Sequence, residues 1–234
     1  MSFSAFRSSL SWQTDFKDKI ELMVHCNKQV FNSFQVNTYV VYVDEGPCII
    51  IDPACAEESE RQVMLDFIST KKLKPEMILA THGHFDHLPG VHFIKERYGI
   101  PFCGHRDDLS YLQFARQSGE LYGFEFDADP PEFDRFYEDE ETIVWGGGSF
   151  RVLHVPGHSR GSLAFDFKES GFVITGDVLF DGSIGRTDLP GGDYDTLIRS
   201  IHTKLLVLED QTVVYSGHGP ETTIGKERVS NPFL

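Results

Sequence analysis

The most informative stretch of this sequence, from which its fold and metal site are predicted, reads Thr81-His82-Gly83-His84-Phe85-Asp86-His87. It directly follows the apolar, β-rich run Met77–Ala80 and supplies four candidate metal ligands within six positions. A helix would spread these side chains around its axis, so the spacing predicts an extended, turning loop at the end of a strand. In such a loop His82 and His84 project to one side while Asp86 and His87 reach a neighbouring point. The loop therefore predicts ligands for two adjacent metal ions.

Three further candidate ligands stand in the same context, behind a β-rich run and beside a glycine that permits a sharp turn. They are His158 after Phe150–Val155, Asp177 after Phe172–Thr175, and His218 after Thr212–Tyr215. A single residue of this kind is more often a hydrogen-bonded surface or turn residue. Together with the 82–87 loop, the repeated context instead predicts one metal centre built at strand ends. The remaining histidines lack this context and are assigned structural roles: His25, His92, His105, His154 and His202.

Strand-like and helix-like segments alternate along the chain. Short β-rich runs predict strands at Thr38–Val43, Cys48–Ile51, Met77–Ala80, Phe150–Val155, Leu163–Phe167, Phe172–Thr175 and Thr212–Tyr215. Helical patterns cover Ala56–Lys71, Val91–Tyr98 and a segment from an Asp193 cap through Leu205. Because helices separate some strands and short turns join others, the pattern predicts an α/β protein with a mixed sheet.

Nothing in the sequence divides the chain, since it has no repeat, low-complexity tract or linker. This predicts a single domain over residues 1–234. One insertion, at about 107–141, interrupts the alternation: it begins as a helix and continues as an acidic loop rich in aromatic residues. An insertion of this length usually covers a site or a partner surface. The alternative, that its aromatic residues only cover the local core, is equally open.

The composition disfavours several classes of protein. A balance of 21 basic and 36 acidic residues gives a net charge of −15, which repels nucleic acids and anionic membranes at long range. The cysteines lack any Cys-x-x-Cys spacing, so reduced thiols are expected at Cys26, Cys48, Cys55 and Cys103. Residues 2–7 show no signal-peptide pattern and no segment reaches about 18 apolar residues, which predicts a cytoplasmic location.

The ordered set of a His-x-His-x-Asp-His loop, a later histidine, an aspartate and a final histidine resembles the signature of the metallo-β-lactamase-fold superfamily. Within that superfamily, the segments 185–192 and 217–220 look like glyoxalase II (hydroxyacylglutathione hydrolase) and its short bacterial relatives. The resemblance runs from about Asn37 to the C-terminus. It implies a four-layered αββα sandwich of two mixed β-sheets, with the metals at the edge between the sheets.

The resemblance also implies a role for each candidate ligand. Metal one would be held by His82, His84 and His158, metal two by Asp86, His87 and His218, with Asp177 bridging both. Asp52 matches a position that orients a ligand by hydrogen bonding. Two zinc ions suit this set of ligands, and iron and manganese also accept mixed imidazole and carboxylate ligands.

A binuclear site of this kind predicts a hydrolase. Two ions about 3.5–4 Å apart acidify a shared water, so the expected nucleophile is a metal-bridging hydroxide, with Asp86 and Asp177 as the catalytic carboxylates. No motif marks a general acid, and a thiolate leaves without protonation more readily than an amine does. The substrate predicted here, also by the resemblance, is a small thioester such as S-lactoylglutathione. The candidate cations for an anionic thiol carrier are Arg186, Lys226 and Arg228.

Other functions remain open from the sequence. The nearest is a persulfide dioxygenase, a relative that segment 185–188 also resembles and that holds one iron on residues matching His82, His158 and Asp177. A metal-stabilised binding protein without turnover, with the aromatic insertion as its partner surface, is the alternative from another class. A β-lactamase is disfavoured by Asp177, a nuclease by the net charge and a flavodiiron protein by His84. The acyl group, the thiol carrier and the oligomeric state stay undetermined.

Overall fold

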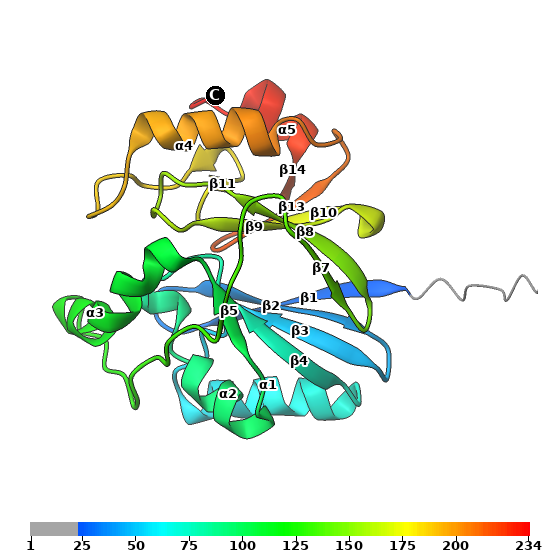
Figure 1. Ribbon diagram of the computed structural model, residues 1–234, viewed down its shortest axis with the longest axis vertical. Helices are drawn as coiled ribbons and strands as arrows, with labels where there is room; N and C mark the ends of the chain where they lie inside the picture. Colours follow the sequence, from blue (N-terminus) through cyan, green and yellow to red (C-terminus); the bar gives the residue numbers. More distant parts are fainter. Residues whose placement is uncertain (1–22) are drawn as a thin grey trace, which may run out of the picture.

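Two six-stranded β-sheets form the centre of the computed structural model, which describes residues 23–234 (Figure 1). The expectation about a targeting segment at residues 2–7 lies outside the described residues. The first sheet contains, in spatial order, β1 (Val24–Phe31), β2 (Val36–Val43), β3 (Pro47–Ile51), β4 (Lys74–Leu79), β5 (Phe102–Gly104) and β6 (Arg135–Phe136). Strands β1 to β3 are antiparallel and β3 to β6 are parallel, so this sheet is mixed.

The second sheet is also mixed. Its spatial order is β14 (Thr222–Thr223), β13 (Val213–Ser216), β10 (Phe172–Gly176), β9 (Leu163–Phe167), β8 (Gly148–His154) and β7 (Thr142–Trp145). Only β10 and β13 pair in parallel, and the other neighbours are antiparallel. A separate short hairpin consists of β11 (Leu179–Phe180) and β12 (Ser183–Ile184). All seven predicted strands are present.

Helices cover the outer face of each sheet. The helices are α1 (Glu58–Thr70), α2 (Val91–Tyr98), α3 (Leu109–Leu121), α4 (Tyr194–Ser200) and α5 (Ile224–Ser230). Helices α1 and α2 lie below the first sheet and α4 and α5 above the second, which gives the four-layered αββα sandwich (Figure 1). Asp193 caps α4 as predicted, because its side chain accepts a hydrogen bond from the Thr196 amide at 2.7 Å. No helix within residues 23–234 has the length and apolarity needed to cross a membrane.

Three apolar layers hold the sandwich together. Strand β3 shows why its sequence is continuously apolar: Ile49 and Ile51 pack between the two sheets, while Ile50 packs under α1 with Met64. Each of these side chains is fully buried and stabilises the fold by about 1.5–3 kcal/mol relative to exposure. The third layer lies between the second sheet and α4 and includes Leu197.

The insertion at 107–141 has two parts with different roles. Its loop aromatics fill local core: Phe124, Phe126, Phe133 and Tyr137 are buried. Its helix, α3, stands instead at the side of the sandwich, next to the loops that follow β4 and β8 (Figure 1). The loop part of the insertion thus packs mainly as local core, with Phe136 exposed, and α3 lies beside the edge where those two loops emerge.

Candidate metal centre

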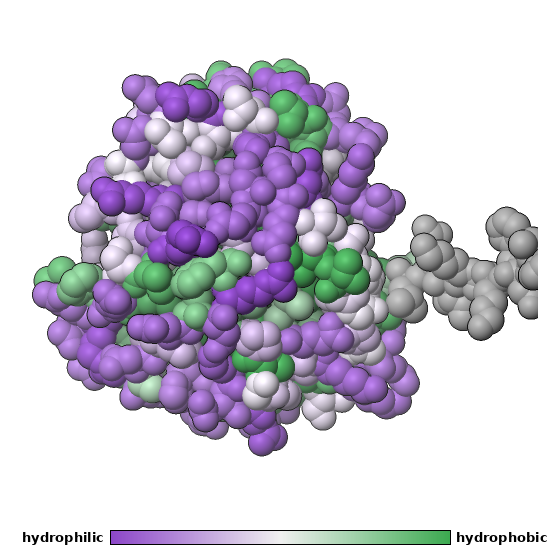
Figure 2. Space-filling view, in the orientation of Figure 1, coloured by the Kyte–Doolittle hydropathy of each residue, from purple (hydrophilic) through white to green (hydrophobic). Residues whose placement is uncertain are grey.

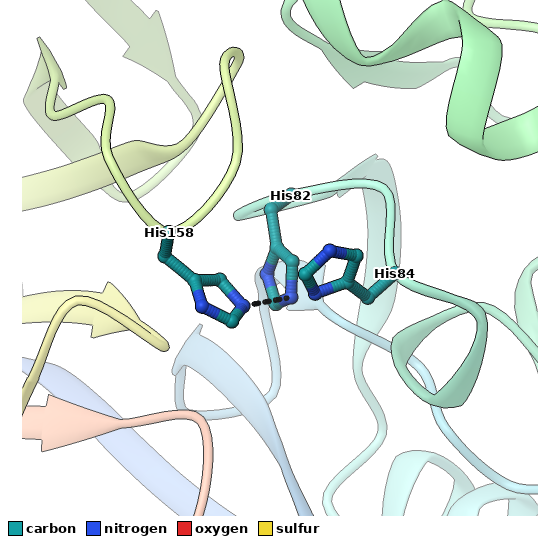
Figure 3. A group of neighbouring side chains, drawn as sticks. All are labelled: His82, His84 and His158. Atoms are coloured by element: carbon teal, nitrogen blue, oxygen red, sulfur yellow. Dashed lines mark hydrogen bonds between the residues drawn. The ribbon is translucent and has the colours of Figure 1, made fainter. Parts of the chain in front are cut away.

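The loops after β4, β8, β10 and β13 meet at one edge of the sandwich and bring all seven candidate ligands together. The 82–87 loop leaves β4 as an extended turn and closes with a 3-10 turn at Phe85–His87. His158 comes from the loop after β8, and it points at His82 and His84 from the opposite side (Figure 3). Ligands separated by up to 136 positions, from His82 to His218, thus converge on one point.

The first group of candidate ligands is His82, His84 and His158, whose ligand atoms lie within 4.8 Å of one another. His82 Nδ1 lies 3.0 Å from Thr81 Oγ1, a hydroxyl whose own hydrogen goes to a carboxylate, so the imidazole donates there. His158 Nδ1 donates to the backbone oxygen of Arg186 at 2.9 Å. In both neutral rings Nε2 therefore carries no hydrogen, and its lone pair is available to a metal, as in metal-binding histidines.

The distance between these two lone pairs fits a bound ion. His82 Nε2 and His158 Nε2 are 3.3 Å apart, the contact drawn as a dashed line in Figure 3, and these tautomers leave no hydrogen to share between them. A tetrahedral ion with metal–nitrogen bonds of about 2.0–2.1 Å holds its ligand nitrogens about 3.3–3.4 Å apart. His84 Nε2, the third ligand atom, is buried without a hydrogen-bond partner.

The second group is Asp86, His87 and His218, again with ligand atoms within 4.8 Å. His87 Nδ1 donates to Asp52 Oδ2 at 3.0 Å and His218 Nδ1 donates to the Phe34 backbone oxygen at 3.0 Å. Their Nε2 atoms are thereby turned towards the carboxylates, with His218 Nε2 3.5 Å from Asp86 Oδ2. As in the first group, Nδ1 of each histidine is occupied by a hydrogen bond and Nε2 faces the other ligands.

Asp177 lies between the two groups. Its Oδ2 is 3.7 Å from His158 Nε2 and 3.4 Å from His218 Nε2, and its Oδ1 is 3.6 Å from His87 Nε2. The buried atoms His84 Nε2, His87 Nε2 and Asp177 Oδ1 all lack a hydrogen-bond partner. Leaving a buried polar atom unpaired costs about 1–3 kcal/mol. Three such atoms around one point are explained if cations complete the site, so the residues present fit metal ions.

The protonation of the ligands differs between the groups. Burial lowers the pKa of His84 to about 3 and holds the pKa of His82 well below its usual range, so both rings are neutral and ready to bind a cation. Burial also lowers the pKa of His218, but hydrogen bonding with Asp177 and Asp86 outweighs it and raises that pKa to about 11. A cation at the second group must therefore displace a proton from His218.

The comparison with protein families agrees with this geometry. A family model described as the metallo-beta-lactamase superfamily matches residues 32–218. The chain belongs to this family. The match explains why the predicted sandwich and the histidine loop occur together, and it makes a metal-dependent hydrolase the general class of the protein.

Curated relatives of similar length give more detail. A "Probable metallo-hydrolase YqgX" of Bacillus subtilis is 42% identical over 202 residues, 86% of this chain and 92% of that protein. The "Hydroxyacylglutathione hydrolase GloC" of Haemophilus influenzae is 40% identical over 205 residues, 86% of this chain and 94% of that protein.

Two solved structures are also similar. The BLEG-1 B3 metallo-beta-lactamase superposes with a TM-score of 0.80 at 35% identity, covering 90% of this chain and 99% of that one. TTHA1623, solved in a di-iron-bound form, superposes with a TM-score of 0.79 at 39% identity, covering 89% of this chain and 100% of that one. A β-lactamase, a hydroxyacylglutathione hydrolase and a di-iron-bound protein are thus all similar to the chain.

Asp52 supports ligands of both groups in this metallo-beta-lactamase-family site. It follows β3 in a left-handed backbone conformation with φ of 48°, which is uncommon for a residue other than glycine. Its carboxylate accepts hydrogen bonds from the Thr81 amide at 2.7 Å and the Thr81 hydroxyl at 2.6 Å, besides His87 Nδ1. One carboxylate therefore orients His87 directly and His82 through Thr81. This role of Thr81 could not be predicted from the sequence pattern.

A second buried carboxylate, Asp108, was also missed from the sequence. Its Oδ2 accepts from the Gly83 amide and the Ser159 hydroxyl, both at 2.8 Å, and its Oδ1 accepts from the Gly161 amide at 2.6 Å. Gly83 separates two ligands of the first group, and Ser159 follows the third. Asp108 therefore ties together the two loops that carry His82, His84 and His158. The one sequence signal for Asp108 was that it follows β5 closely, at the edge of the sheet where the ligand-bearing loop after β4 also begins.

A further cluster of His105, Asp107 and His154 does not fit an ion. The two imidazole rings are stacked nearly parallel, with centroids 4.2 Å apart and an interplanar angle of 12°. Lone pairs lie in the planes of their rings, so two parallel rings cannot direct them at one cation. His154 Nε2 also donates to the Arg160 backbone oxygen at 2.8 Å. The stacking is in keeping with the structural roles expected for both histidines.

Of the three cations expected near a thiol carrier, only Arg186 lines the cavity beside the metal ligands. Lys226 forms an ion pair with Asp181, and Arg228 pairs with Asp210. These pairs belong to the surface around α5. Lys226 and Arg228 therefore do not line this cavity, in keeping with the alternative that such cations are solvated at the surface.

Proposed function

We propose that this protein hydrolyses a small thioester of the hydroxyacylglutathione kind at a site for two metal ions. The first ion would be held by His82, His84 and His158, the second by Asp86, His87 and His218, with Asp177 between them. The proposal rests on one observation: five histidines and two aspartates converge, and three of their buried nitrogen and oxygen atoms lack a hydrogen-bond partner. Similarity to the Haemophilus influenzae hydroxyacylglutathione hydrolase supports the choice of a thioester.

Two bound ions would supply a water with its pKa lowered towards about 7 and positive charge beside a developing oxyanion. Zinc is our first choice, because a tetrahedral arrangement of imidazole nitrogens suits it. Mixed imidazole and carboxylate ligands also suit iron, the metal present in the TTHA1623 structure.

The protein's own residues define the rest of the chemistry. Asp86 and Asp177 both line the cavity, so their carboxylates can accept a hydrogen from the attacking water and fix its direction. The phenol of Tyr111, another lining residue, donates to the Pro190 backbone oxygen, and burial raises its pKa. Tyr111 is therefore a poor proton donor for a leaving group. A leaving group that departs as a thiolate suits such a cavity.

The test measures thiol release from S-lactoylglutathione and metal content on the same preparation. Asp177→Ala should lower kcat/KM by about a hundredfold or more, because it removes the residue shared by both groups. His202→Ala, an exposed histidine outside the site, should leave activity and metal content unchanged. Equal activity of wild type and Asp177→Ala would refute the proposal.

The same preparation separates the rival functions. Oxygen uptake with glutathione persulfide, one iron per chain and sulfite as product would establish the dioxygenase instead. Hydrolysis of a cephalosporin faster than any thioester would establish a β-lactamase, like the similar BLEG-1 B3 metallo-beta-lactamase. A protein that metal stabilises against heat but that turns over none of these compounds would be a binding protein.

A further inference from the structure

The cavity beside the metal ligands has two chemically different sides. It encloses about 640 Å³. One side is apolar and consists of Phe34, Phe85, Phe114, Leu121 and Tyr122, which we call the apolar wall. The other side carries Arg160 and Arg186, beside His158. The apolar wall lies next to the second group of ligands, because Phe85 precedes Asp86 and the Phe34 backbone accepts from His218.

The apolar wall is a packed arrangement of rings. Phe85 meets Phe34 edge to face with ring centroids 5.1 Å apart, and it stacks on Tyr122 at 5.4 Å and 15°. Phe124, which is buried, backs both phenylalanines at about 6 Å. The wall is thereby held in place by the core of the insertion.

Helix α3 extends the apolar wall towards solvent. Phe114, Ser118 and Leu121 lie at positions i, i+4 and i+7, so they share the face that lines the cavity. The opposite face buries Leu112 and Ala115 against the core.

Large parts of the apolar wall are open to solvent. The exposed fractions are 57% for Phe114, 82% for Leu121 and 53% for Tyr122. Figure 2 shows apolar side chains gathered over α3 at the left of the molecule, below a polar band. Exposed apolar residues that adjoin one another at the mouth of a cavity are typical of a surface that a ligand covers.

One of the two arginines that line the cavity is already paired with a carboxylate. Asp188 accepts two hydrogen bonds from the Arg186 guanidinium, at 2.7 and 2.8 Å, so the charge of Arg186 is already balanced. Within residues 23–234, the Arg160 side chain makes no ion pair with a carboxylate. Of the two arginines, Arg160 is therefore the one that can receive an anion.

We propose that the site selects thioesters that carry a bulky apolar or aromatic group, which covers the apolar wall, and one anionic group, which pairs with Arg160. The inference rests on the proposed thioester hydrolysis and names its substrate class. A lactoyl group is too small to cover three partly exposed side chains, so S-lactoylglutathione would be a minimal substrate. The apolar group can belong to the acyl part or to the thiol part of the thioester, and in either case it would cover the same apolar wall.

A binding experiment tests the apolar wall without turnover. Isothermal calorimetry would compare S-benzylglutathione with S-methylglutathione, which share the peptide and differ in the apolar group. We expect about tenfold tighter binding of the benzyl compound, the preference that burying a phenyl ring can give. Phe114→Ala should remove most of this preference. Phe233→Ala, which changes a phenylalanine of similar exposure (49%) outside the cavity, should keep it.

Kinetics then locate the apolar group and test Arg160. One arm compares phenylacetyl with lactoyl thioesters of glutathione, and the other compares lactoyl thioesters of benzyl mercaptan and mercaptoethanol. We expect at least one arm to show about a tenfold preference in kcat/KM that Phe114→Ala abolishes. Arg160→Gln should lower kcat/KM about fivefold for thioesters of anionic mercaptopropionate and leave those of mercaptoethanol unchanged.

The outcomes separate this inference from the proposed function. Equal affinity for the two glutathione compounds, or the same behaviour of Phe114→Ala and Phe233→Ala, would overturn the apolar wall as a selector. If the benzyl compound is preferred but no thioester is hydrolysed, thioester hydrolysis is wrong while the preference for an apolar ligand is upheld by binding alone.

Discussion

Replacing Asp108 by Asn changes one oxygen into an NH₂ group and leaves the size of the side chain the same. Asp108 accepts hydrogen bonds from two backbone amides, those of Gly83 and Gly161, and from the Ser159 hydroxyl. The hydroxyl can rotate and accept from the new NH₂ group, but the amides cannot. In either orientation of Asn, one backbone amide therefore faces another donor inside the protein.

The magnitude follows from these contacts. A buried donor without an acceptor costs about 1–3 kcal/mol, and the remaining bonds lose the strengthening that a charged acceptor gives. We expect a loss of about 2–3 kcal/mol in the free energy of unfolding, which lowers the unfolding midpoint by roughly 5–10 °C for a chain of this size. Because Asp108 joins the two loops of the first group, metal affinity there should fall about 10- to 100-fold.

The assay is thermal unfolding by circular dichroism together with zinc titration against a chelating competitor. Asp107→Asn is the matched control, since this neighbouring carboxylate is half exposed and lies 3.8 Å from His105 without a close hydrogen bond. It should change the unfolding free energy by less than about 0.5 kcal/mol. If Asp108→Asn unfolds and binds zinc like Asp107→Asn, the claim that Asp108 holds the two loops together is wrong.

Three further predictions concern the second group of ligands. Asp52→Asn should weaken zinc binding about 10- to 100-fold in a chelator titration, because Asp52 fixes the tautomer of His87; unchanged affinity would contradict this role. The pKa of His218 is about 11, so zinc binding at this group releases a proton from it. Zinc affinity there should therefore rise about tenfold per pH unit from His218 alone, and a pH-independent affinity would refute this. Gly217→Ala should prevent filling of the second ion position, because the added Cβ would collide with Asp177 Oδ1 and approach His87 Cε1 at 2.9 Å; a full metal count in this variant would show that the pocket adapts.

The fold was predictable where burial left a clear pattern. Strand β3 is apolar at every position because the sheets cover one face and the helices the other, and β2 is buried throughout in the same way. Strand β1, at the edge of the first sheet, was missed because Val24–Phe31 is mostly half buried and contains polar residues at adjacent positions. Its pairing with β2 depends on tertiary contact rather than on its own sequence pattern.

The candidate ligands were predictable because each follows a strand beside a glycine. Their supporting residues were not, since their roles depend on contacts between distant positions: Asp108 meets Ser159 from 51 positions away. The apolar wall was also hidden, because Phe34 and Phe85 meet Tyr122 only after folding. A sequence pattern shows which residue types stand at strand ends, but it does not show which loops face one another.

The most direct test of the account is the number of metal ions per folded chain, measured by inductively coupled plasma mass spectrometry after loading and removal of loosely bound metal. The account predicts two ions in the wild type and one in His87→Ala, which removes a ligand of the second group alone. A wild-type count of one or none, or an unchanged count of two in His87→Ala, would contradict it.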